Sequence, residues 1–185
     1  MTPLPTALQA KPDTPDIVGW RLGRTQHRDA WNSGYGAREY GGRWNEVGRS
    51  IVYASLDPST ALAEVSVHVS FQTLLVVQHV MTSFRVLDAA KVRVVDASQL
   101  NAHPDWLEPG LPTPAQQAFG TSLFTEKLPF VVIPSVVSPH SWNLIFDAEL
   151  AKLNIDYELI GHEQYRLDRR LASIAIAGAI AKKII

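Results

Sequence analysis

The apolar residues of this chain fall into short runs, and glycine or proline interrupts most of them. Runs of about four to eight residues that are rich in valine, isoleucine and aromatic side chains are typical of strands. The pattern predicts strands over residues 17–22, 50–55, 74–80, 84–88, 92–95 and 129–133, and two further short segments over 157–160 and 165–168. A chain of this kind favours sheets made of short strands.

Helix signals are fewer. Asp57 and Pro58 pair an N-cap acid with a proline at the first helical position, which predicts a helix to about residue 68 or 71. Further helices are predicted over 114–125 and 170–185, and loops over 32–48 and 101–114. This mixed order predicts an α+β fold, a single domain with short antiparallel sheets and flanking helices.

Length and charge narrow the class of function. The chain has 185 residues, of which 46% are hydrophobic, so it fits one domain and is not mostly disordered. Its formal net charge is −1, so it lacks the broad positive field that drives non-specific nucleic-acid binding. We therefore expect no direct binding to nucleic acid or to a membrane surface, whereas a few placed arginines can still bind a small anion.

The two ends of the chain differ from its centre. Residues 1–16 carry four prolines and no basic head before an apolar run, so we interpret them as a flexible leader. Residues 17–171 are expected to form the ordered domain, and residues 172–185 an apolar, helical extension. The most apolar stretch, 171–181, is too short to span a bilayer. The chain has no cysteine, which fits a cytoplasmic protein without disulfides.

The predicted helix after Asp57 carries one formally charged residue, Glu64, among alanine, leucine and valine side chains. A carboxylate on a largely apolar helix is costly to bury unless a partner stabilises it, so Glu64 is a candidate functional group. His68 follows one turn later on the same face. Two alternatives stay open here, a rim glutamate that points to water and a Glu–His metal pair. The metal pair is the weaker one, because H-E-x-x-H spacing is absent.

A second candidate lies in the glycine-rich segment. Arg43 follows Gly41 and Gly42, so its guanidinium can approach a phosphate or carboxylate and bind it through two hydrogen bonds. Asn45 adds an amide that both donates and accepts. The alternative is a surface arginine stacked on Trp44. The segment is neither a dinucleotide fingerprint nor a P-loop, because it lacks the third glycine and the Gly-Lys-Ser/Thr element.

Ser135 follows a buried-strand pattern that Pro134 ends. No Gly-x-Ser-x-Gly elbow surrounds it, so we interpret it as a hydrogen-bonding group for a ligand or for the turn, and not as a hydrolase nucleophile. The six histidines are scattered without metal-ligand spacing, and no metal is expected.

Together these segments resemble the RES domain, the toxin half of bacterial RES–Xre toxin–antitoxin pairs. The resemblance covers residues 20–171, and its specific part is the Gly-Gly-Arg-Trp-Asn block with a glutamate 21 residues after the arginine. The matching segments are, in chain order, Arg21 and residues 34–37, 41–45, 51–53, 61–64, 133–135 and 167–171.

The resemblance implies a fold similar to ADP-ribosyltransferase toxins of the diphtheria type. It also implies an enzyme that consumes NAD⁺ by hydrolysis, by phosphorolysis or by transfer of ADP-ribose to a protein. Carried over by motif, the catalytic residues would be Arg43, Tyr53, Glu64 and Ser135. The residues that bind NAD⁺ would be Arg21, Arg43, Asn45 and Tyr53.

These residue types suit the chemistry that the resemblance implies. Cleavage of the nicotinamide–ribose bond builds positive charge on the ribose, as in glycoside cleavage, and Glu64 would stabilise that charge. Arg21 and Arg43 would hold the pyrophosphate, Tyr53 would stack on the nicotinamide, and Ser135 would orient Glu64 or the nicotinamide amide. Nicotinamide leaves as a neutral molecule, so the reaction requires neither a metal nor a strong general acid.

The resemblance further implies an Xre-like antitoxin as partner. The apolar run from residue 171 to 185 is a candidate contact with that partner or with a second copy in a homodimer, and an ordinary core helix is the alternative. Two other functions stay open. One is a mono-ADP-ribosyltransferase that modifies a protein, and the other is a catalytically silent module that holds a nucleotide or a partner.

Overall fold

The computed structural model describes residues 16–95, 99–100, 102–138 and 140–171. Its strands are β1 (Ile17–Arg24), β2 (Ile51–Ser55), β3 (His79–Val86), β4 (Val92–Val94), β5 (Phe130–Pro134), β6 (Trp142–Asp147) and β7 (Tyr157–Tyr165). Its α-helices are α1 (Tyr35–Tyr40), α2 (Pro58–Ser66), α3 (Phe71–Val76) and α5 (Pro114–Ser122), and 3₁₀ helices cover Thr25–Ala30, Ala89–Lys91 and Pro104–Leu107.

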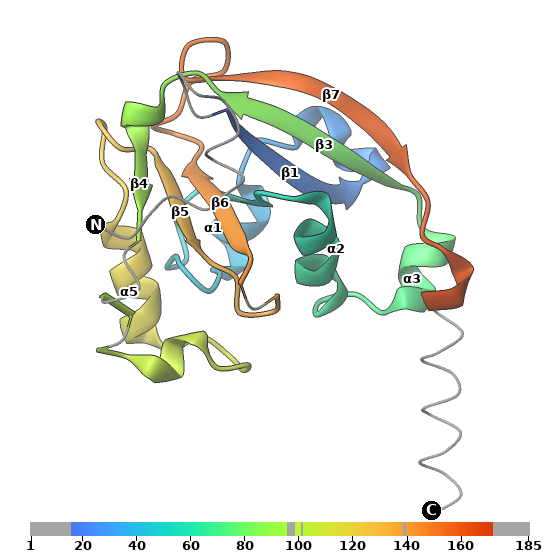
Figure 1. Ribbon diagram of the computed structural model, residues 1–185, viewed down its shortest axis with the longest axis horizontal. Coiled ribbons are helices and arrows are strands. Elements are labelled where there is room, and N and C mark those ends of the chain that lie inside the picture. The colour runs from blue at the N-terminus through green and yellow to red at the C-terminus, as the bar shows by residue number, and fades with distance from the viewer. Residues whose placement is uncertain (1–15, 96–98, 101, 139, 172–185) are drawn as a thin grey trace, which may run out of the picture.

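The seven strands form one sheet in the order β4-β5-β6-β2-β1-β3-β7 (Figure 1). Neighbouring strands are antiparallel, except that β4 and β5 run parallel. The predicted α+β class is therefore confirmed, with one larger sheet in place of several short ones.

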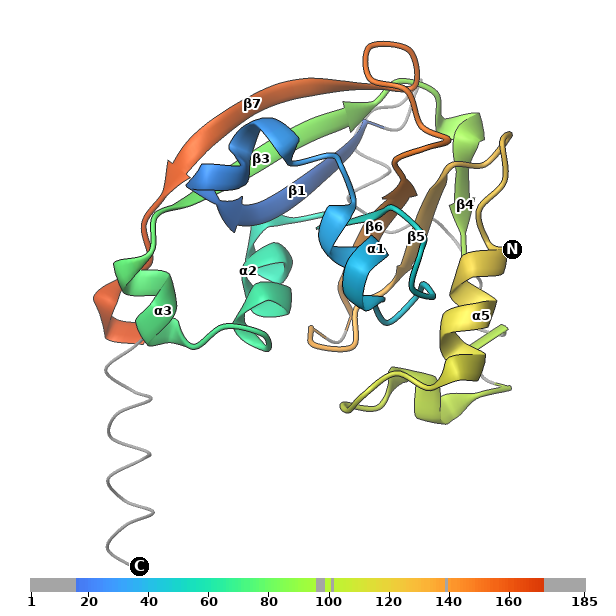
Figure 2. The ribbon, with the colours of Figure 1, turned by 180° about the vertical axis from the view of Figure 1, so that it is seen from behind.

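Strand pairing in this sheet is weakest between β1 and β2, a boundary that we call the joint. β1 and β2 pair through a single pair of residues, Trp20 and Ser55. Beyond the joint the pairing is continuous, because all of β1 pairs with β3 and all of β2 pairs with β6. Helix α2 lies at the joint and packs against β1, β2 and β6 (Figures 1 and 2). The fold therefore leaves room for a cavity where its two halves diverge.

Successive side chains along the central strands point to opposite faces of the sheet, so the sheet has a hydrophobic core on each face. Phe130 and Phe146 pack with Phe84 in an aromatic cluster on one face. Their chain neighbours Val131 and Ile145 belong to the cluster on the other face, which also holds side chains from α5. A third, smaller cluster joins α2 and α3 to β1 and β3.

Two helices begin where local sequence signals predict. The carboxylate of Asp57 accepts the backbone N–H of Thr60 at 2.8 Å and so caps α2. Thr113 and Gln116 form a reciprocal capping box at the start of α5. Helix α2 ends at Ser66, earlier than predicted, and α5 ends within the predicted range.

The prediction of separate strands over 74–80 and 84–88 is wrong. Residues Phe71–Val76 form helix α3, and one strand, β3, covers His79–Val86. The hydroxyl of Ser70 accepts the backbone N–H of Thr73 at 3.2 Å, and this N-cap outweighs the β propensity of the valines that follow.

Other elements depart from prediction more modestly. Helix α1 lies inside the segment 32–48 that was predicted to be a loop, and Gly34 precedes it with a φ of 63°, a conformation that favours glycine. Strand β6 was not predicted, and β7 covers the expected segment 157–160 but ends at Tyr165, so residues 166–168 are not a strand as expected. The leader over 1–15, the extension over 172–185 and most of the predicted helix 170–185 lie outside the described residues.

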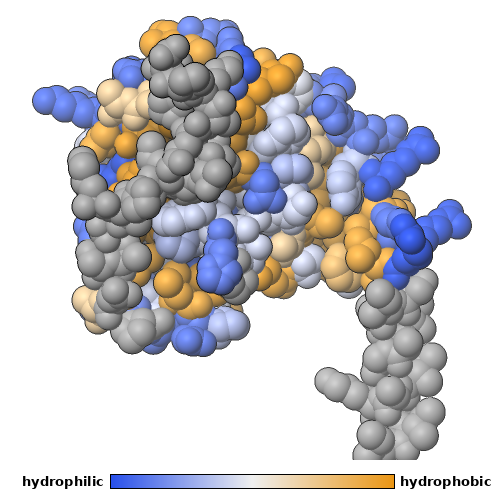
Figure 3. Space-filling model, viewed as in Figure 1, coloured by the Kyte–Doolittle hydropathy of each residue, from blue (hydrophilic) through white to orange (hydrophobic). Residues whose placement is uncertain are grey.

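Hydrophobic and hydrophilic residues are interspersed over the face shown in Figure 3. Within the described part of the chain, no helix combines the length and the hydropathy needed to cross a membrane.

Candidate active site

A cavity of about 1070 Å³ opens at the joint between the two halves of the sheet. Its walls come from β1, β2, β6, α2 and the segment 109–112, and from residues 41–44 after α1, which we call the glycine-rich turn. Ligand sites usually measure about 300–1,000 Å³, so this cavity is large enough for an extended small molecule.

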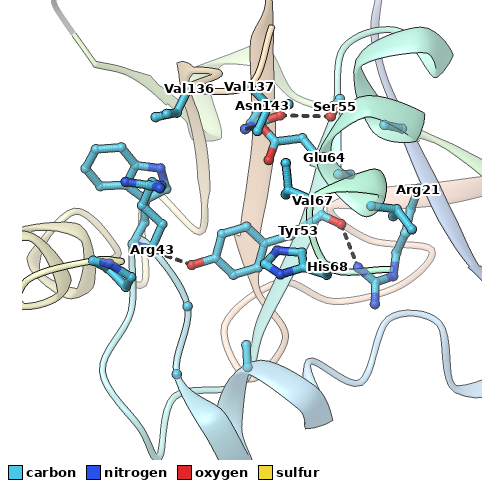
Figure 4. A pocket seen from close by; sticks show the side chains of 18 of the residues that line it. Arg21, Arg43, Tyr53, Ser55, Glu64, Val67, His68, Val136, Val137 and Asn143 are labelled. Atoms are coloured by element: carbon cyan, nitrogen blue, oxygen red, sulfur yellow. Dashed lines mark hydrogen bonds between the residues drawn. The ribbon is translucent and has the colours of Figure 1, made fainter. Parts of the chain in front are cut away.

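Glu64 extends from α2 into this cavity (Figure 4). Its Oε1 accepts hydrogen bonds from Ser135 Oγ at 2.8 Å and from Asn143 Nδ2 at 2.6 Å. Among the described residues no group hydrogen-bonds Oε2, so that oxygen is free to meet a ligand. A half-buried carboxylate held by two donors differs from the water-facing rim glutamate that was the alternative.

The two donors to Glu64 are themselves held in place. Ser135 lies just after β5, and the backbone N–H of Ser138 donates to its hydroxyl at 2.9 Å. Asn143 lies on β6, and its Oδ1 accepts a hydrogen bond from Ser55 Oγ of β2 at 2.8 Å. The sequence-based site included Ser135 but not Asn143. The one local signal for Asn143 is a polar residue within an otherwise apolar run.

Arg21 reaches the cavity from β1. Its Nη1 donates to the backbone carbonyl of Tyr53 at 2.7 Å, and no carboxylate of the described residues lies within ion-pair distance. Burial lowers the pKa of Arg21, yet a guanidinium stays charged in proteins. It carries five N–H donors, so most of them are free to bind an anion.

Arg43 lies on the other side of Tyr53 from Arg21 (Figure 4). Its Nη2 donates to the backbone carbonyl of Gly110 at 2.7 Å. Trp44 is 1% exposed, so it is a core residue and not the surface partner on which Arg43 would stack under the alternative. The two guanidinium groups thus border one cavity from opposite sides of an aromatic ring.

Tyr53 ties the glycine-rich turn to the sheet. Its hydroxyl accepts the backbone N–H of Trp44 at 2.9 Å and donates to Asn45 Oδ1 at 2.8 Å. Burial raises the pKa of Tyr53 well above its usual range, although the bond from Trp44 opposes the shift, so the phenol stays protonated and can donate.

The structure places Asn45 away from the cavity wall, contrary to its predicted contact with a ligand. Its side chain is fully buried, and its Nδ2 donates to the backbone carbonyl of Ala37 at 3.0 Å. Asn45 therefore supports Tyr53 and the turn from behind.

The cavity gathers most of the residues that the sequence singled out. Arg21, Arg43, Tyr53 and Glu64 line it, while Ser135 contacts the carboxylate of Glu64. His68 also lines it, as an exposed side chain beyond the end of α2. In the described segments, no group of three or more histidine, aspartate or glutamate side chains could hold a metal ion. A carboxylate with a free oxygen, in the same cavity as two guanidinium groups, can stabilise positive charge that develops beside an anionic group.

Comparisons with known proteins identify the family to which this chain is related. The model of the RES domain matches residues 19–168. The chain is 29% identical to Toxin Res of Photorhabdus laumondii over 160 residues, which cover 84% of this chain and 97% of that protein. It is 30% identical to Toxin Res of Pseudomonas putida, with 76% and 94% covered. It is 31% identical to the Prs ADP-ribosylating toxin of Sphingobium sp., with 69% and 80% covered.

The fold also has a solved counterpart. The chain matches a chain of the M. tuberculosis MbcT–MbcA toxin–antitoxin complex with a TM-score of 0.67 and 20% identity, over 85% of this chain and 90% of that one. At this identity the likeness shows the fold alone. The RES domain model, in contrast, spans most of the sequence, which confirms the resemblance inferred from the motifs. The chain belongs to the RES domain family.

Proposed function

We propose that this protein is the toxin of a toxin–antitoxin pair and that it cleaves the nicotinamide–ribose bond of NAD⁺. The observation that carries this proposal is the shared cavity, in which the free oxygen of Glu64 and the guanidinium groups of Arg21 and Arg43 border the same space. The relatives named Toxin Res and ADP-ribosylating toxin support a toxin that acts on NAD⁺.

The carboxylate has a direct role in the proposed reaction. When the bond between the ribose carbon and the nicotinamide nitrogen breaks, its electron pair moves to the ring nitrogen and neutral nicotinamide leaves. The ribose carbon and its ring oxygen then share a positive charge, as in glycoside cleavage. Glu64 Oε2 would stabilise this charge, and a preorganised group of this kind lowers the activation barrier by about 3–4 kcal/mol.

The remaining residues would bind the dinucleotide. Arg21 and Arg43 offer unused N–H donors to the pyrophosphate, whose charge they would balance. The ring of Tyr53 lies between them and offers a flat surface for the nicotinamide (Figure 4). No step in this scheme uses a metal ion.

The acceptor of ADP-ribose distinguishes three reactions of the same site. Water or phosphate would attack the ribose carbon and release a proton, which gives ADP-ribose or its 1″-phosphate. A protein side chain as acceptor is the second candidate, and the similarity to the Sphingobium ADP-ribosylating toxin favours it.

The test is incubation of the purified protein with NAD⁺ labelled in its adenylate half. Nicotinamide, ADP-ribose, ADP-ribose 1″-phosphate and labelled protein are quantified with water alone, with phosphate and with a protein extract. We expect Glu64→Gln to lower the release of nicotinamide by about 10²- to 10³-fold. Glu126→Gln is the matched control, because Glu126 is exposed and lies outside the cavity. A wild-type protein that leaves NAD⁺ intact would refute the proposal.

We also propose an antitoxin of the Xre class as partner, since the structural neighbour belongs to a toxin–antitoxin complex. Expression of this chain in the bacterial cytoplasm should arrest growth, and co-expression of the antitoxin should restore it. Light scattering of the isolated chain and of the complex would show whether a homodimer forms. Normal growth despite measurable loss of cellular NAD⁺ would contradict the assignment as a toxin.

A further inference from the structure

We infer that Asn143 is a positioning residue for Glu64, and that Ser55 fixes the direction in which the amide of Asn143 points. The inference rests on the proposed function, because it assigns a role in the same reaction. It starts from the chain of hydrogen bonds that runs from Ser55 Oγ to Asn143 Oδ1 and from Asn143 Nδ2 to Glu64 Oε1.

This chain of hydrogen bonds has one consistent direction. An ionised carboxylate only accepts hydrogen bonds, so Asn143 must present its NH₂ group to Glu64. The amide oxygen then faces Ser55, whose hydroxyl must donate to it. A flipped amide would place two oxygens against each other at the 2.6 Å contact with Glu64.

The anchor of this chain of bonds is the centre of the sheet. Ser55 and Asn143 are directly paired residues of β2 and β6, with exposures of 1% and 6%. Ser55 is also the residue that joins β2 to β1. Ser135, the other donor to Glu64, lies on a turn after β5. Of the two donors, Asn143 is therefore the one held by continuous strand pairing.

The consequence concerns which oxygen of Glu64 meets the substrate. The terminal torsion of a glutamate is broad, so an unheld carboxylate can rotate. Asn143 and Ser135 both bind Oε1, which leaves Oε2 as the oxygen available to a ligand in the cavity. Loss of Asn143 removes one of these two restraints and leaves a charged oxygen with a single donor.

Three variants test the inference by steady-state kinetics with NAD⁺. We expect Asn143→Ala to lower kcat by about 10- to 100-fold, with a smaller change in KM, since the residue acts through its hydrogen bond to Glu64. Ser55→Ala should lower kcat by about fivefold, because Ser55 is one hydrogen bond further from Glu64 than Asn143 is. Asn32→Ala is the control. It removes an asparagine amide that donates to the Tyr157 hydroxyl outside the cavity, and kcat should not change.

A fourth variant separates positioning from a merely structural role. Asn143→Asp keeps the shape of the side chain but places a second carboxyl group beside Glu64. At pH 8 both groups are charged and repel each other. On acidification the pair takes up one proton, and the neutral acid can donate to Glu64 as the amide does. The ratio of variant to wild-type kcat should rise about tenfold between pH 8 and pH 5.

Other titratable or charged groups line the same cavity as this pair. They are Arg21 from β1, Arg43 from the glycine-rich turn, Tyr53 from β2 and His68 from the end of α2. The wild-type protein carries the same groups, so a pH effect that is common to both proteins cancels in the ratio of the two rates.

The outcomes distinguish the two proposals. If the wild-type protein does not consume NAD⁺, the proposed function fails and this inference fails with it. If the wild type turns over NAD⁺ but Asn143→Ala matches its kcat, or the Asn143→Asp ratio does not change with pH, only the positioning role is refuted. If Asn143→Ala does not fold, as judged by circular dichroism, Ser55→Ala and Asn143→Asp decide the question by the same criteria.

Discussion

Replacement of Tyr53 by phenylalanine removes one hydroxyl that holds two parts of the cavity wall together. That hydroxyl accepts the N–H of Trp44 and donates to Asn45 Oδ1. Trp44 and Asn45 are 1% and 0% exposed, so Tyr53→Phe leaves two buried polar groups without these partners. The turn that carries Arg43 would also lose its link to β2.

The size of the effect follows from these two groups. An unsatisfied buried donor or acceptor costs about 1–3 kcal/mol. Tyr53 lines the cavity, so water there can satisfy part of what is lost. We therefore expect the free energy of unfolding to fall by about 2–4 kcal/mol, with a fall of about 5–15 °C in the melting temperature. Because the turn carries Arg43, KM for NAD⁺ should rise more than kcat falls.

Urea denaturation with an unchanged m-value measures the loss of stability. Tyr35→Phe is the control, because the Tyr35 side chain is 65% exposed, and it should change stability by less than about 0.5 kcal/mol. An unchanged urea midpoint for Tyr53→Phe would show that the ring, and not the hydroxyl, holds the turn. If Tyr53→Phe and Tyr35→Phe raise KM for NAD⁺ by the same factor, the position of Arg43 does not depend on this hydrogen bond.

Three further substitutions test other parts of the structure. Asp57→Ala removes the N-cap of α2 and should lower the free energy of unfolding by about 1–2 kcal/mol, measured in thermal melts. Burial opposes ionisation of Asp156, but hydrogen bonds from a lysine ammonium and a backbone amide outweigh this effect and lower the pKa of Asp156. The ionised carboxylate therefore stabilises the fold above the ordinary pKa of 3.8, and this stabilisation is lost as the pH falls below that value. Asp156→Asn should therefore destabilise the protein at pH 7 and flatten the acid side of the stability profile, measured by urea denaturation from pH 7 to pH 3. Gly42→Ala would place a Cβ 2.4 Å from Tyr53 Oη and should raise KM for NAD⁺, whereas Gly36→Ala has open space and should not.

Local signals in the sequence were enough to locate some elements of the fold. The start of α2 depends on Asp57 and Pro58, which act within one helical turn, and the strand over 129–133 ends at a proline. The valine-rich stretch 74–80 fits a strand or a helix equally well, and the cap at Ser70 decides the outcome. Strand β6 carries a buried asparagine and an aspartate that obscure its apolar pattern.

The sequence likewise reveals some residues of the candidate site and not others. Arg43 and Glu64 stand out in sequence because each is a charged residue in an unusual local setting, a pair of glycines and an apolar helix. Asn143 does not, since its contact with Glu64 exists only after β6 pairs with β2. Asn45 illustrates the opposite case. An amide in a glycine-rich turn looks the same in sequence whether it points to a ligand or, as here, into the core.

Arg21, Tyr53 and Asn143 stand on three strands that are neighbours in the sheet but far apart along the chain. A ribosome makes these strands in the order β1, β2 and β6, and the third is complete only at residue 147. A polypeptide still under synthesis therefore has no complete wall for this cavity until most of its length exists. Premature termination anywhere before that point would yield a product that cannot assemble the pocket, whatever its early segments do alone.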